Sequence, residues 1–162
     1  MVQHVLVGAV LVLVAAVAVA AAPAVSAYTR TASAGGVDVK VIYASAEYFA
    51  AAKDGEGAKR FAPEKQVVFL VAMDTHAGDL MAFDVVRNSR LRTVAGGATR
   101  EYAPVRWEST SDGSHHRSGA LIFPASVNGT KVIGPAVTSI ALVIADLAGV
   151  PARTFEWALP IR

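Results

Sequence analysis

The hydrophobic pattern divides this chain into an apolar beginning and a longer part in which apolar and polar residues alternate. Every residue from Val5 to Val25 is Val, Leu, Ala, Gly or Pro, and the first charged side chain is Arg30. A run of about 20 apolar residues is long enough for a helix to cross the hydrocarbon core of a bilayer. The pattern therefore predicts a transmembrane anchor or a secretory signal at residues 1–27.

Two interpretations of this segment stay open. The small residues Ala24–Ala27 suit cleavage of a signal peptide. A signal peptide also begins with basic residues, and only the terminal amine and His4 precede the apolar run. We expect a retained single-pass anchor in the cytoplasmic membrane at residues 5–25, with the rest of the chain in the periplasm or outside the cell.

After residue 27 the hydrophobic period becomes that of strands. Residues 28–36 are small and polar, which predicts a flexible tether. Val37–Tyr43 alternates almost strictly, which predicts a strand with one face in the core. The alanine-rich stretch Ser45–Lys53 predicts a short helix capped by its serine, and the charged stretch 54–65 predicts a loop.

The remaining sequence shows short strand patterns separated by turns. Gln66–Met73 is a continuous apolar run, which predicts a central strand covered on both faces. Further strand patterns lie at residues 82–86, 90–95, 100–107, 117–123, 139–145 and 154–159. Polar loops are predicted at 74–79 and 109–114, and Asn128-Gly129 is the strongest hairpin signal because both positions tolerate positive φ.

These elements predict a mainly β fold. About seven short strands with frequent turns are typical of an antiparallel immunoglobulin-like β-sandwich, here preceded by one apolar transmembrane helix. The sandwich is expected at residues 37–162 as a single extracytoplasmic domain.

Composition narrows the possible partners. The chain has 15 Lys and Arg against 13 Asp and Glu, a net charge of +2, and the basic residues are scattered among acidic ones. Nucleic-acid binding needs a concentrated basic face, so we expect no nucleic-acid partner. Cysteine is absent, so disulfides, iron–sulfur clusters and a blue-copper thiolate are excluded.

Three of the four histidines lie in the two polar loops. His76 lies in the first loop, and His115 and His116 follow the second. If the flanking strands run antiparallel, both loops lie at one end of the sandwich. The three imidazoles with the carboxylate of Asp79, or alternatively of Asp74 or Asp112, would then give a four-coordinate copper or zinc site.

A structural role competes with the metal site. Histidines in loops often bond to backbone carbonyls, and aspartates there often form turns and caps. Adjacent residues of a strand point to opposite faces, so His115 and His116 can share one ion only where the backbone is irregular. The spacing also matches no established metal motif, which favours the structural interpretation.

The chain carries no signature of an enzyme. It lacks a nucleophile elbow, a glycine-rich phosphate loop and an HExxH helix. Thr75-His76, Trp107, the stretch His115–Phe123 with its HHRSG start, and Arg153–Trp157 together resemble small exported prokaryotic β-sandwich domains of no assigned activity. The resemblance implies an exported immunoglobulin-like domain and no substrate.

Two functions follow from the sequence. The first is a non-catalytic, membrane-anchored accessory or assembly subunit, whose partners are the other subunits of a larger membrane complex such as a respiratory or photosynthetic one. The second is a periplasmic copper or zinc binder that uses the histidine loops. An adhesive or carbohydrate-binding module ranks below both, because the sequence shows no row of exposed aromatic residues.

Overall fold

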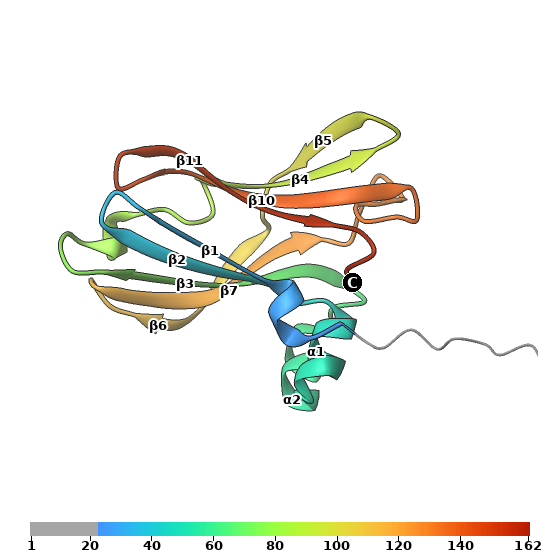
Figure 1. Cartoon of the computed structure of the whole chain (residues 1–162), viewed down its shortest axis with the longest axis horizontal. Coiled ribbons are helices and arrows are strands. Elements are labelled where there is room, and N and C mark those ends of the chain that lie inside the picture. The colour runs from blue at the N-terminus through green and yellow to red at the C-terminus, as the bar shows by residue number, and fades with distance from the viewer. Residues whose placement is uncertain (1–22) are drawn as a thin grey trace, which may run out of the picture.

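The alternating segments form two antiparallel sheets in a computed structural model that describes residues 23–162 (Figure 1). The first sheet has five strands, in the spatial order β1 (Thr29–Ala34), β2 (Val37–Tyr43), β3 (Gln66–Thr75), β7 (His116–Pro124) and β6 (Arg106–Asp112). The second sheet has four strands, in the order β11 (Val150–Ala158), β10 (Val137–Leu147), β4 (Ser89–Ala95) and β5 (Ala98–Tyr102). The predicted mainly β, antiparallel fold is therefore confirmed.

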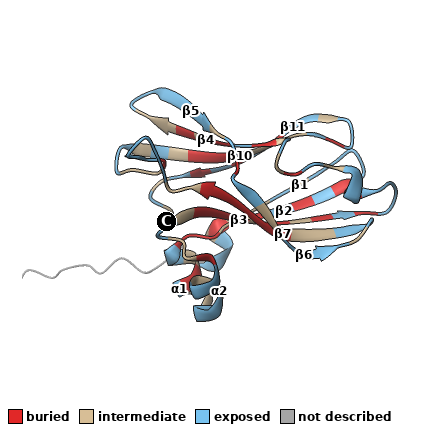
Figure 2. Cartoon of the chain, turned by 180° about the vertical axis from the view of Figure 1, so that it is seen from behind, coloured by how far each residue is buried: buried red, intermediate tan, exposed pale blue. Residues whose placement is uncertain are grey.

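The main core lies between the two sheets. The first sheet supplies valines of β2 and the large residues Phe69 and Phe123, and the second supplies Leu142, Phe155 and Trp157. These side chains are at most 3% exposed. Removing such a side chain from water stabilises the fold by about 1.5–3 kcal/mol before the loss of chain entropy is subtracted. Both sheets thus bury the face that they turn toward each other, and exposed residues lie mainly on β5, β6, the loops and the outer sides of the helices (Figure 2).

A second core covers the outer face of the first sheet. Helices α1 (Ala46–Ala52) and α2 (Gly55–Phe61) pack Phe49 and Phe61 against Val68 and Ile122. Because Val68 points away from the main core while its neighbours point into it, β3 is buried on both faces, as its continuous apolar run predicted.

Helix α1 confirms one sequence prediction and α2 corrects another. The Ser45 hydroxyl accepts a hydrogen bond from the backbone N–H of Tyr48, which caps α1. The stretch 54–65, predicted as a loop, contains a second helix. Asp54 caps that helix by accepting a bond from Gly57 N at 2.8 Å, and the burial of Phe61 holds the helix on the sheet.

The predicted tether at residues 28–36 is wrong. Residues Thr29–Ala34 form β1, which pairs with β2 from Thr29↔Ile42 to Ala34↔Val37. A 3-10 helix, η1 (Val25–Tyr28), precedes the strand and buries its tyrosine. Small polar residues suit this edge strand because backbone hydrogen bonds, and not apolar side chains, hold it.

Three other segments refine the prediction. Residues 82–86 do not form a strand. This region is a loop that contains a short helix, η2 (Leu80–Ala82), and a turn, and it buries the side chains of Leu80 and Val85. Most of the loop predicted at 109–114 belongs to the polar edge strand β6. The hairpin at Asn128-Gly129 is confirmed: it joins β8 (Ser126–Val127) to β9 (Thr130–Lys131) with φ values of 51° and 76°.

The predicted transmembrane helix lies mostly outside the described residues, which begin at 23. Among residues 23–162, no helix has the length and apolar character that a membrane crossing requires.

Gly119 of β7 allows the Trp107 side chain of β6 to lie close against its strand. A Cβ atom at Gly119 would lie 2.5 Å from the Glu108 carbonyl oxygen and 2.6 Å from the Trp107 ring. We predict that Gly119→Ala lowers the free energy of unfolding by about 1–3 kcal/mol, because a backbone atom cannot yield as a side chain can. Chemical denaturation measures the change.

Gly134→Ala is the matched control, since its added Cβ would approach no atom closer than 3.9 Å. Equal stability of the two variants would contradict the packing argument.

Candidate functional site

The two histidine loops meet at one end of the sandwich, as predicted. Strands β3 and β7 are antiparallel with Asp74 opposite His116, and the His116 Nδ1 atom lies 2.5 Å from Asp74 Oδ1. The backbone N–H of Thr75 donates to the carbonyl of His115 at 2.9 Å. Backbone pairing of two strand ends therefore brings these loops together.

The remaining predicted ligands do not join His116. The carboxylate of Asp79 accepts a hydrogen bond from Met81 N at 2.9 Å and so caps η2. The side chains of His76 and His115 are exposed. In residues 23–162, no three His, Cys, Asp or Glu side chains are placed to hold one metal ion. Of the predicted ligands within residues 23–162, only His116 and Asp74 contact each other. Copper or zinc binding stays a prediction.

Arg117 organises this end of the molecule, a role that the sequence did not reveal. Its Nη1 group donates to the carbonyls of Leu80 and Phe83 at 3.0 and 2.7 Å, and its Nε donates to Asp112 Oδ1 at 3.1 Å. The guanidinium lies 5.8 Å from the centre of the Trp107 ring. Arg117 thus attaches the loop around η2 to the edge of the first sheet.

The same contacts act on Asp112. A hydrogen bond from the Ser109 side chain, and then the bond and charge of Arg117, hold the pKa of the Asp112 carboxyl below its ordinary value. The carboxylate is exposed, so it contributes to loop geometry more than to stability.

We predict that Arg117→Gln frees the loop around η2. Losing bonds from a largely buried guanidinium should destabilise the fold by about 2–4 kcal/mol and speed hydrogen exchange at residues 79–86. Mass-spectrometric hydrogen exchange measures the effect.

Arg106→Gln is the control, because the Arg106 side chain is 45% exposed and pairs with Glu108 on the surface. Equal rates of hydrogen exchange in this loop for both variants would contradict the organising role of Arg117.

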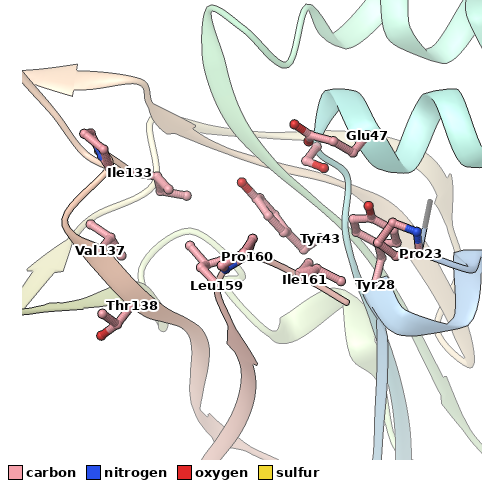
Figure 3. A pocket seen from close by; sticks show the side chains of 13 residues that line it. Pro23, Tyr28, Tyr43, Glu47, Ile133, Val137, Thr138, Leu159, Pro160 and Ile161 are labelled. Carbon is pink, nitrogen blue, oxygen red and sulfur yellow. The ribbon is translucent and has the colours of Figure 1, made fainter. Parts of the chain in front are cut away.

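The opposite end of the sandwich holds a pocket of about 450 Å³ (Figure 3). Its walls come from η1, the start of α1, the loop before β10 and the segment after β11. Most of the lining is apolar: Pro23, Tyr28, Tyr43, Ile133, Pro135, Val137, Leu159, Pro160 and Ile161. Pockets of this size and character are typical sites for small ligands.

The polar groups of this pocket lie on one side. The Tyr43 side chain reaches into the same space as the Glu47 carboxylate (Figure 3). Burial, followed by the charge of Glu47 and the proximity of Tyr28, raises the pKa of Tyr43 to about 12. The α1 side of the pocket is therefore unfavourable for a second anion.

A basic pocket of about 370 Å³ adjoins the apolar one. It is lined by Arg30 and Arg162 and shares the segment Leu159–Ile161 with the apolar pocket. Arg30 Nε donates to the Glu156 carbonyl at 2.9 Å, and its Nη1 donates to the carbonyls of Ala27 and Thr29. This end of the molecule thus joins an apolar cavity to two guanidinium groups.

We predict that Tyr43 couples folding to alkaline pH. The pKa is about 12 in the folded chain against 10 for a free tyrosine, so the protonated hydroxyl contributes up to about 2–3 kcal/mol below pH 10. This contribution is lost as pH rises through the folded pKa. Denaturation of wild type and Tyr43→Phe between neutral pH and pH 12 measures it, with the variant showing less loss.

A tyrosinate absorbance titration gives an independent measurement. Tyr102→Phe removes a tyrosine outside this pocket and should keep the component near 12 that Tyr43→Phe removes. A component near 12 that keeps its full amplitude in Tyr43→Phe would contradict the assignment of that component to Tyr43.

Comparisons with protein-family models, with curated proteins and with solved structures found no match to this chain.

Proposed function

We propose that this chain is a membrane-anchored extracytoplasmic domain that serves as an accessory or assembly subunit of a larger membrane complex, such as a respiratory or photosynthetic one. In this proposal the two sheets form an immunoglobulin-like sandwich and the apolar run 5–25 is retained as a single-pass anchor. The proposal assigns no catalytic activity to the chain.

The proposal rests mainly on one observation: residues 28–36 form part of the folded domain and not a flexible tether. The apolar run ends in η1, and β1 follows directly at Thr29. Tyr28 is only 2% exposed, so the domain already holds the chain three residues after the run ends at Val25. A membrane helix ending here would hold the domain against the bilayer surface, as suits a subunit that docks on a membrane complex.

Two open sheet edges support a partner-binding role. Strands β6 and β5 end the two sheets on one side, and most of their residues are exposed. On the other side, Arg30 of β1 bonds to the Glu156 carbonyl of β11 and links the two edges. An open edge strand offers unpaired backbone groups to a second protein.

The anchor is tested in the full chain with a C-terminal tag. We expect the protein to resist alkaline carbonate, to require detergent for extraction and to have an intact mass that includes residues 1–27. Leu11→Arg/Leu13→Arg should abolish retention, because each arginine in the middle of a membrane helix costs about 2.5–3.5 kcal/mol. Leu11→Ala/Leu13→Ala keeps the run apolar and is the control.

The same preparation tests the partner. Mild detergent extraction should release the chain in an assembly larger than a monomer, with other membrane subunits in fixed proportion. A soluble chain whose mass begins at Tyr28 would overturn the anchor, and an anchored chain that purifies alone would overturn the subunit role.

A further inference from the structure

The described chain begins at the wall of the apolar pocket. Pro23, the first described residue, lines this cavity together with Tyr28. Pro23 also belongs to the apolar run 5–25. If the run lies in a bilayer, as the proposed function on which this inference rests requires, the wall of the pocket formed by Pro23 lies close to the membrane surface.

Apolar and basic side chains lie next to each other at the end of the domain that holds the two pockets. Leu159, Pro160 and Ile161 form a wall that the apolar pocket shares with the basic one. The apolar pocket is further lined by Tyr28, Ile133 and other apolar groups, and the basic pocket by Arg30 and Arg162. An apolar cavity beside a cationic one matches a molecule that carries hydrocarbon next to an anion.

Both arginines have donors for an anion. The hydrogen bonds of Arg30 within residues 23–162 use Nε and Nη1, so Nη2 keeps its donors. Arg162 is exposed, and its side chain has no hydrogen bond or ion pair within the same residues. Guanidinium groups bind phosphate oxygens with paired, charge-assisted hydrogen bonds.

The charge of Glu47 sets the orientation of such a molecule. The Glu47 carboxylate lines the apolar pocket on the α1 side, away from the shared wall (Figure 3). A phosphate would be repelled there and attracted at the arginines. The ligand's anion therefore belongs in the basic pocket and its hydrocarbon in the apolar pocket.

We propose that this end of the domain binds one anionic phospholipid from the leaflet in which the apolar run 5–25 is inserted. The phosphate contacts Arg30 and Arg162, and the upper part of an acyl chain occupies the pocket lined by Tyr28 and Ile161. The site fixes how the domain stands on the membrane, in addition to the single covalent link at Pro23.

Native mass spectrometry of the full chain in detergent tests the site, with phosphatidylglycerol as the probe and phosphatidylcholine as the neutral comparison. We expect one bound phosphatidylglycerol and an affinity about tenfold above that for phosphatidylcholine, because both lipids carry the phosphate but the two guanidinium groups repel the choline cation. Arg162→Gln should remove most of the preference. Lys40→Gln/Arg87→Gln, which removes two exposed charges outside both pockets, should keep it.

Two further variants keep the test decisive. Arg30→Gln also breaks bonds that join β1 to β11, so its loss of lipid counts only where its melting temperature stays near that of wild type. Ile161→Glu puts a carboxylate on the shared wall and should abolish phosphatidylglycerol binding without removing an arginine.

The outcomes separate this inference from the proposed function. Equal binding of both lipids, or displacement of phosphatidylglycerol by millimolar inorganic phosphate, would overturn the lipid site while leaving the anchor intact. A chain that binds phosphatidylglycerol in detergent but is not retained in membranes would overturn the anchor alone.

Discussion

The packing of aromatic side chains between the two sheets is the interaction on which the rest of the structure depends. The Phe69 ring of β3 lies 5.6 Å from Trp157 of β11 and 5.8 Å from Phe123 of β7, measured between ring centroids. Because side chains alternate along a strand, a shift of one residue in β11 would expose Trp157 and bury the carboxylate of Glu156. The core therefore fixes the register, and the register fixes which residues end each strand.

The ends of the strands then acquire different chemistry. At the histidine end, buried arginines hold the turns together: Arg153 donates to the carbonyls of Leu147 and Ala34 at 2.7 Å each, and burial lowers its pKa. Backbone carbonyls thus supply the partners of a charge that would be costly to bury alone. At the other end the segments around Tyr43 and Leu159 leave an apolar cavity between them, and this cavity lies beside the exposed Arg162. One sandwich therefore has a closed polar end and an open amphipathic end.

The histidine loops show how far strand reasoning reaches. Antiparallel pairing was enough to predict that the two loops share an end, because Asp74 and His116 lie opposite each other near the ends of two paired strands. It could not predict that Asp74, and not Asp79, meets the imidazole, since that choice depends on loop backbone. Nor could it identify Arg117, whose partners are mainly carbonyls and leave no pattern in the side chains.

The sequence by itself determined the elements whose side chains carry the signal: β2 through its alternation, β3 through its continuous apolar run, α1 through its serine cap, and the hairpin at Asn128-Gly129. The tertiary structure alone decided β1, where backbone pairing replaces hydrophobic burial, and the two pockets beside Leu159–Ile161, whose walls come from segments far apart in the chain. The physical reason is that the local hydrophobic pattern depends on which residues are buried when the chain folds. A site depends on which distant segments come into contact in the folded chain, and the local pattern does not contain that information.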